Sequence, residues 1–411
     1  MWDLALWWEW LSFAARWTHV ITAIAWIGSS FYFIALDLGL NRDIAGPADG
    51  EEWQVHGGGF YHIQKYLVAP ERMPEHLTWF KWESYATWLS GFALLMVVYW
   101  AGGEIYLIDQ SKADLDIYEG MLLSAAVLGG GWLFYNTLCQ SRMANRPTVL
   151  MVVLFLFLVV LGWALNQVFT GRAMMLHLGA FTATIMSANV FFIIIPNQKI
   201  VVADLKAGRK PDPKYGKIAK LRSTHNNYLT LPVIFLMLSN HYPLAFASHY
   251  NWLIAALVFL MGVTIRHYFN THHAKAGDPR WTWVATAVLF LAAVFLSLAG
   301  REQAGDEDYA LSGTAQALAA APGFDTVQEI VSANCSMCHA REPFYDGIAH
   351  APKGVLLETP NDLARNGRAV FLQAGVTHAM PPANLTYMED EARAAIRAWY
   401  RSADLQGLGQ L

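Results

Sequence analysis

Long apolar runs follow one another through the first 300 residues of the chain. A helix needs about 20 predominantly apolar residues to cross the core of a lipid bilayer. Eight runs approach or reach that length, and the sixth is the shortest: residues 11–36, 83–101, 120–139, 148–168, 173–195, 228–242, 252–268 and 281–299. The series predicts an all-α fold, an eight-span transmembrane helical bundle over residues 1–300 in contact with membrane lipid.

The composition excludes several other classes of protein. Charged residues make up 15% of the chain and hydrophobic ones 55%, whereas a soluble domain is roughly 25% charged. A disordered chain is excluded, and an ordinary soluble enzyme is disfavoured. The net charge of −4 offers no basic surface to nucleic acid. The first fifteen residues contain no Lys or Arg, which predicts a retained span there and not a signal peptide.

Basic residues are distributed unevenly between the loops. If the N-terminus lies outside, seventeen Lys and Arg residues fall in or next to the inner loops, and the outer loops carry only Lys112 and Arg172. Basic loops stay on the cytoplasmic side of a membrane. The N-terminus and the whole chain beyond residue 300 are therefore predicted to lie outside the cytoplasm.

The polar tail contains the most specific motif of the sequence. Cys335-Ser-Met-Cys338-His339 is the C-x-x-C-H pattern of covalent c-type haem attachment. The two thiols would form thioethers with the haem vinyl groups, and His339 would bind the iron. Met380 follows 41 residues later and is the candidate for the sixth ligand, since thioether sulfur raises a haem potential.

A zinc site is the competing interpretation of this motif, but it would need more Cys or His at paired spacing. The tail offers only His350 and His378 besides. We therefore predict a linker at 301–322 and a class I cytochrome c domain at 323–411. Its covalent haem would supply part of the core that so small a domain lacks. A closing helix is expected at 385–401, with Thr386 as its N-cap.

The apolar part shows signs of an internal repeat. The first run has His19 and, ten residues later, Ser29, and the fifth run has His177 and Ser187 at the same spacing. Two copies of a four-helix unit would share one orientation, which predicts a 4+4 parallel repeat with a site at its interface.

His19 and His177 allow two interpretations. Intramembrane polar residues are by default functional, and the first run resembles the first span of small membrane proteins that hold haem b through a His. Both histidines are thus candidate ligands of a haem b iron. The alternative is that they only form hydrogen bonds between helices.

A second polar cluster is predicted at the inner face of the bundle. The loop before the second run reads His56-Gly-Gly-Gly-Phe-Tyr-His62, followed by Lys65, and its glycines favour a tight hairpin. A solvated surface is the alternative for any single member. The cluster comprises His62, Lys65, Trp82, Glu83, His225, Asn226, Asn227, Arg266 and His267.

Three stretches resemble the membrane-bound urate oxidases of bacteria, the PuuD type or urate hydroxylases. They are WTHVITAIAWIGSSFYFIALD, GGGFYHIQKYLVAP and LTWFKWESYATWLSGFALL. The resemblance implies eight spans fused to a cytochrome c in a bacterial inner membrane, with the N-terminus and the cytochrome in the periplasm. It also implies conversion of urate to 5-hydroxyisourate in purine degradation, with electrons passed through haem c towards a downstream cytochrome c or a terminal oxidase, not directly to oxygen.

The resemblance also gives the inner cluster its expected roles. His225, His267 and Glu83 become the candidate catalytic residues, because a base is needed for the water that adds to urate. A binding site for a planar anion needs charged hydrogen-bond donors, amide groups and an aromatic plane. The candidate binding residues are Lys65, His62, Trp82, Asn226, Asn227 and Arg266.

Three alternatives are considered at this point. The same parts would suit a cytochrome-c-linked dehydrogenase of another substrate, such as a quinol. A membrane anchor for an electron carrier would need only one span, and a transporter would leave the haem domain without a purpose. The oligomeric state, including a homo-oligomer, is not determined by the sequence.

Overall fold

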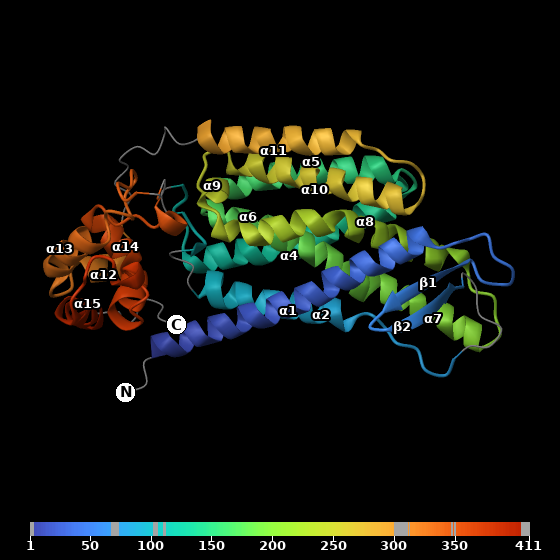
Figure 1. The fold of residues 1–411 in the computed structure, drawn as a ribbon, viewed down its shortest axis with the longest axis horizontal. Helices are drawn as coiled ribbons and strands as arrows, with labels where there is room; N and C mark the ends of the chain where they lie inside the picture. Colours follow the sequence, from blue (N-terminus) through green and yellow to red (C-terminus); the bar gives the residue numbers. More distant parts are fainter. Residues whose placement is uncertain are drawn as a thin grey trace.

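The computed structural model describes residues 4–66, 74–101, 106–109, 112–299, 311, 313–346, 348 and 351–403. Long helices run side by side, and a smaller unit sits at one end of them (Figure 1). The bundle contains α1 (Leu4–Gly39), α2 (Trp82–Leu95) continued by η1 (Met96–Trp100), α4 (Ile117–Gln140), α5 (Pro147–Asn166), α6 (Gly171–Ala188), η3 (Asn189–Ile194), α7 (Ile195–Lys206), α8 (Pro213–Leu238), η4 (Ser239–His241), α9 (Pro243–Phe246), α10 (Asn251–His273) and α11 (Trp281–Ala299).

Six helical segments among the described residues are long and apolar enough to cross a membrane. They are Trp7–Gly39, Ile117–Gln140, Pro147–Asn166, Gly171–Lys206, Asn251–His273 and Trp281–Ala299. The second and sixth predicted spans correspond to α2 with η1 and to α8, which pack on α1 and α6 respectively. The charged first half of α8, which carries three lysines and Arg222, lowers its apolar character.

Local sequence explains where several helices begin. Asp116 and Glu119 form a reciprocal capping box at the start of α4. Thr170 caps α6 by accepting from the Ala173 amide. Asp212 caps α8, whose first residue is a proline. Each cap satisfies amide groups that have no partner inside the helix.

The core of the bundle forms around α6. Most of its side chains are buried, including Met174, Phe181 and Met186. The outer faces of α1 and α11 instead expose large apolar side chains such as Ile24 and Phe295, which suits contact with lipid. The contacts also repeat in part: α1 packs on α2 as α6 packs on α8, and α10 touches α1 as α4 touches α6.

A small hairpin departs from the predicted all-α fold. Strands β1 (Gly50–His56) and β2 (Gly59–Lys65) pair antiparallel. Gly57 and Gly58 make the turn with φ of 59° and 80°, the positive values that a two-residue type I′ turn needs. The tight hairpin predicted from the glycines is therefore confirmed. It lies at the end of the bundle away from the tail (Figure 1).

The tail (residues 313–403) is helical. Its helices are α12 (Gly313–Ala319), α13 (Phe324–Asn334), α14 (Pro360–Val370), η6 (Phe371–Val376) and α15 (Asp390–Ser402), with short turns η5 (Pro352–Gly354) and η7 (Pro382–Asn384). Leu318 of α12 is buried in the tail core beside Trp399. Part of the predicted linker at 301–322 thus belongs to the compact tail, since the Trp399 indole donates to the Leu318 carbonyl (3.0 Å).

The cap predicted for the closing helix was wrong. Helix α15 begins at Asp390 with Glu389 as N-cap, and the Thr386 hydroxyl instead donates to Asn334 (2.7 Å). Tyr387, which would be the first residue of that helix, has a φ of 54° and therefore does not begin one.

Candidate functional site

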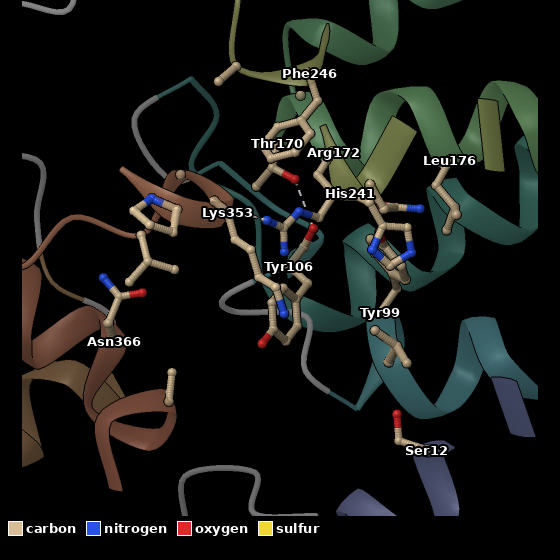
Figure 2. A pocket seen from close by; sticks show the side chains of 18 of the residues that line it. Ser12, Tyr99, Tyr106, Thr170, Arg172, Leu176, His241, Phe246, Lys353 and Asn366 are labelled. Atoms are coloured by element: carbon tan, nitrogen blue, oxygen red, sulfur yellow. Dashed lines mark hydrogen bonds between the residues drawn. The ribbon is translucent and has the colours of Figure 1, made fainter. Parts of the chain in front are cut away.

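A cavity of about 1460 Å³ lies between the tail and the neighbouring end of the bundle (Figure 2). The tail contributes Cys335, Cys338, His339 and Met380 to its lining, and the bundle contributes His19. Figure 2 shows Arg172 between Tyr106 and Phe246, whose rings it faces at 5.9 and 4.7 Å. All four predicted haem c residues thus border one space.

The C-x-x-C-H segment leaves one ring nitrogen of His339 available to a metal. It follows α13 directly, and the His339 amide donates back to the Cys335 carbonyl (2.9 Å). His339 Nδ1 donates to the Val355 carbonyl (2.9 Å), which leaves the Nε2 lone pair for a metal. Burial raises the pKa of the Cys335 thiol to about 11 and also raises the pKa of Cys338. The residues present fit a covalent haem.

The two predicted haem b ligands differ. His19 Nδ1 donates to the Thr87 carbonyl (3.1 Å), and its ring lies against Gly91, where a Cβ would come within 2.7 Å. His19 lines the cavity, and its Nε2 forms no hydrogen bond with the described residues. His177 donates through Nδ1 to the Ala173 carbonyl and accepts at Nε2 from Ser124, both at 2.7 Å. Because both of its ring nitrogens are used, His177 does not fit a haem ligand.

At the other end of the bundle, five buried polar side chains and the half-buried Asn136 form one network. The Arg222 guanidinium, 2% exposed, donates to Asn189 Oδ1 (3.1 Å) and Asn136 Oδ1 (2.6 Å). Asn189 donates to Tyr135 Oη (3.1 Å) and to Asn226 Oδ1 (2.8 Å).

Tyr135 Oη lies 2.9 Å from His225 Nδ1. His225 is 2% exposed, and its Nε2 has no partner in the described part of the chain.

A second chain of polar groups lies between α8 and α10. Arg266 donates to Asn270 Oδ1 (3.0 Å), and Asn270 donates to Asn227 Oδ1 (2.7 Å). The Arg266 guanidinium also covers the Phe31 ring at 4.5 Å. Arg266 Nε and Asn227 Nδ2 are buried without partners among the described residues. His267 pairs with Tyr228 Oη (3.1 Å).

Glu83 has one carboxylate oxygen, Oε2, that is buried and has no hydrogen-bond partner among the described residues. The next residue, Ser84, bonds to Ser187 at 3.1 Å, two positions before Asn189. The start of α2 therefore lies beside the segment that holds the Arg222 network.

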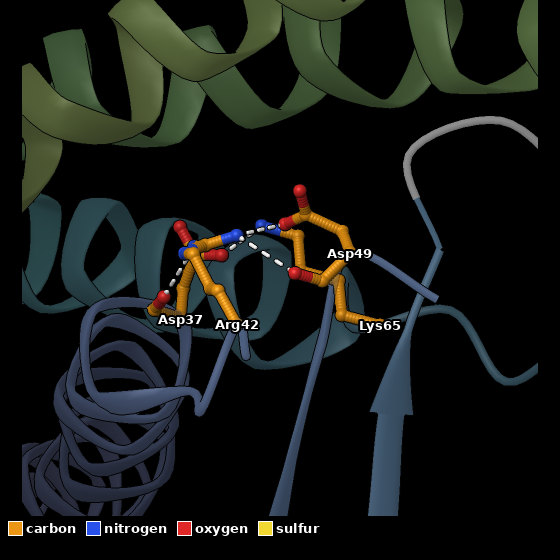
Figure 3. A network of polar contacts seen from close by, with 4 residues as sticks. All are labelled: Asp37, Arg42, Asp49 and Lys65. Carbon is orange, nitrogen blue, oxygen red and sulfur yellow. Dashed lines mark hydrogen bonds and ion pairs between the residues drawn. The ribbon is translucent and has the colours of Figure 1, made fainter. Parts of the chain in front are cut away.

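Three predicted binding residues do not join these networks. Lys65 forms an ion pair with Asp37, beside the pair of Arg42 with Asp49 (Figure 3). Burial, and secondarily Lys220, lowers the pKa of Lys65.

His62 stacks on Trp53 at 4.2 Å and bonds to Glu51 (2.8 Å). That bond holds the pKa of Glu51 below its usual value. Trp82 is 65% exposed. Lys65 and His62 lie on the hairpin, where Asp37 and Glu51 pair with them, and Trp82 lies exposed at the start of α2.

Sequence reasoning missed several members of the inner network. Arg222 is one of the seventeen basic residues predicted at the inner loops, and no further role was predicted for it. Asn189 and Tyr135 lie inside or beside apolar runs. The rule that polar residues within a span are functional applies to Asn189 and would have found it.

Comparison with known proteins gave one family. A family model described as urate oxidase, N-terminal, matches residues 5–297. No curated protein and no solved structure matched the chain. The match covers the bundle and the hairpin and ends before the tail.

Proposed function

The chain belongs to the urate oxidase N-terminal family, and from this we propose that it is a membrane oxidoreductase that converts urate to 5-hydroxyisourate. Urate and water give 5-hydroxyisourate, two protons and two electrons. We propose that the electrons leave through haem c to the respiratory chain, by way of a downstream cytochrome c or a terminal oxidase, and do not go directly to oxygen. The family match is the observation that carries this proposal.

The tail supports the haem c part of the proposal. Cys335 and Cys338 would attach the group, and His339 and Met380 would bind its iron. When bound, haem c supplies a one-electron acceptor outside the bundle. The Val355 carbonyl holds His339 in the tautomer that exposes Nε2.

Of the two predicted haem b ligands, His19 and His177, only His19 fits that role. His19 lines the cavity with Nε2 free, and Gly91 leaves room for its ring. His177 is assigned instead to packing, because displacing Ser124 would leave a buried hydroxyl without this partner.

The inner networks support binding of urate, a planar monoanion at neutral pH. Arg222 and Arg266 form no ion pair with a carboxylate within the described ranges, and amides hold them instead. A buried cation without a counter-ion favours an incoming anion. The unpaired Asn227 amide and the His225 Nε2 are further groups that a substrate would satisfy.

The reaction also needs a base for the attacking water. The unpaired Oε2 of Glu83 suits this role, because no neighbouring donor in the described chain competes for it. His267 already shares its Nδ1 with Tyr228, which suits positioning.

The shape of the molecule supports the proposed placement in the membrane. The first residues of α1 and the tail lie at one end, and the hairpin and α7 lie at the other (Figure 1). With α2–η1 and α8 counted as spans, the bundle has eight. We propose a bacterial inner membrane location, with the N-terminus and tail in the periplasm.

The test is anaerobic titration of the purified, haem-loaded protein with urate. Each urate should reduce two equivalents of haem c, because it releases two electrons, and no peroxide should form. A Cys335→Ser/Cys338→Ser variant, which cannot attach haem, is the matched control without the absorbance change. Reduction by a quinol and not by urate would overturn the proposal in favour of the quinol dehydrogenase.

A further inference from the structure

We infer that Arg222, through Asn189 and Tyr135, holds His225 in the tautomer with its proton on Nε2. His225 then serves the inner site as a hydrogen-bond donor to substrate and not as a base. The inference rests on the proposed function insofar as it names urate as the acceptor. The tautomer itself stands on the geometry of the protein alone.

Arg222 fixes the direction of the bonds around it, because a guanidinium can only donate hydrogen bonds. Its Nη1 lies 3.1 Å from Asn189 Oδ1, and its plane covers the Tyr135 ring at 5.0 Å. The carbonyl side of the Asn189 amide must therefore face Arg222. The nitrogen side then points away from the charge, towards Tyr135 and Asn226.

The other end of the Asn189 amide gives the same orientation independently. Asn226 Nδ2 donates to the Met186 carbonyl (2.9 Å), which can only accept. The Asn226 oxygen is thereby left as the acceptor for Asn189 Nδ2 (2.8 Å). Two unambiguous partners, a guanidinium and a backbone carbonyl, thus orient both amides.

Tyr135 passes this polarity to the imidazole. Its oxygen accepts from Asn189 Nδ2 (3.1 Å), so its own proton is free to go to an acceptor. His225 Nδ1 lies 2.9 Å away. The Cys139 thiol also neighbours this hydroxyl, but sulfur is the weaker acceptor. When Nδ1 of a neutral imidazole accepts a hydrogen bond, the single ring proton is on Nε2.

The Nε2–H group that results is buried with no partner among the described residues. Bonds in such a chain polarise one another, and the Arg222 charge at its start strengthens the donor at its end. A carbonyl oxygen or a deprotonated ring nitrogen of a planar anion is the matching acceptor. Arg222, Asn189 and Tyr135 are positioning residues, since they act through His225.

The first experiment replaces the donor. His225→Gln keeps an N–H near the Nε2 position, whereas His225→Leu has none. We expect the KM for urate to change little in His225→Gln and to rise roughly 10- to 100-fold in His225→Leu, the usual effect of losing a charge-assisted hydrogen bond. A loss of kcat with unchanged KM in both variants would show that His225 is a base and overturn the inference.

The second experiment removes the tautomer's support. Tyr135→Phe should raise KM about 10-fold with a smaller change in kcat, and Cys139→Ala, which removes the competing sulfur, should behave like the wild type. An equal effect of Cys139→Ala would contradict the assignment of the Tyr135 proton to His225.

A third measurement needs no turnover. Nitrogen-15 NMR of histidine-labelled protein, with the His225→Gln spectrum used for assignment, should show His225 protonated at Nε2. Protonation at Nδ1 would overturn the inference whatever the substrate is. If the NMR result holds but urate fails to reduce the haem, then the proposed function fails and the tautomer stands.

Discussion

The two intramembrane histidines use their ring nitrogens differently. Both ring nitrogens of His177 are hydrogen-bonded, to Ala173 and Ser124. His19 Nε2, beside the cavity, has no hydrogen-bond partner among the described residues. Their positions in the sequence are equivalent, with a serine ten residues after each. Only the neighbours brought by other helices separate a candidate ligand from a packing residue.

Met380 is the predicted sixth ligand of the haem c iron, and its substitution tests that role. Because a thioether ligand raises the potential of haem c, Met380→His should lower the midpoint by on the order of 100 mV, well inside the roughly 0.8 V range that axial ligands set. Potentiometric titration at pH 7 measures it. Met388→Leu, a change in the tail core, is the matched control, and an unchanged midpoint in Met380→His would exclude Met380 as a ligand.

At the scale of elements, glycines decide how closely the bundle helices approach. A Cβ on Gly131 of α4 would lie 2.1 Å from the Phe181 ring of α6, whereas one on the adjacent Gly130 would meet nothing within 4 Å. Gly262 of α10 lies similarly against Pro232 of α8, at 2.6 Å. These contacts bring the polar faces of α4, α8 and α10 within hydrogen-bond reach.

Gly131→Ala should therefore destabilise the bundle by roughly 1–3 kcal/mol through overpacking. Gly130→Ala should be neutral or stabilising by up to about 1 kcal/mol, since alanine favours a helix more than glycine does. Thermal unfolding of the two purified variants under identical conditions makes the comparison. Equal stability of the pair would show that Phe181 can move aside.

At the scale of the whole molecule, the tail is held at one end of the bundle by a few polar contacts. Arg368 pairs with Glu9 at 3.3 Å, and Arg172 donates to the Lys353 carbonyl at 3.2 Å. Exposed ion pairs contribute at most about 1 kcal/mol. A bound haem that fills the shared cavity would add apolar contact between the two parts.

The proposed orientation predicts opposite labelling of two exposed phenylalanines. Phe60 of the hairpin is 77% exposed, and Phe344 of the tail is 75% exposed. A membrane-impermeant maleimide should label Phe344→Cys in intact cells with an opened outer membrane, and Phe60→Cys only after the inner membrane is permeabilised. The wild type, whose Cys139 is buried, gives the background. The reverse pattern would contradict the orientation.

Several features of the fold were predictable from the sequence because their cause is local. Apolar runs predict helices, since each residue's hydrogen bond lies four positions away. The glycines of the hairpin and the C-x-x-C-H spacing likewise act within a few residues. The Thr386 cap was wrong because the chain turns at Tyr387, whose φ is 54°, and the Thr386 hydroxyl donates to Asn334, 52 positions away.

The pairing of the buried polar groups depends on the tertiary structure. His225 is hydrogen-bonded to Tyr135, 90 positions away in the sequence, and Arg222 to Asn136, 86 positions away. His62, Lys65 and Trp82 instead find partners or solvent outside the buried networks. The amino-acid order alone indicated the apolar bundle and the C-x-x-C-H motif, because apolar runs and residue spacing are local properties of the sequence. The hydrogen-bond partners of the buried polar side chains depend on helix packing, because packing determines which helix faces are in contact.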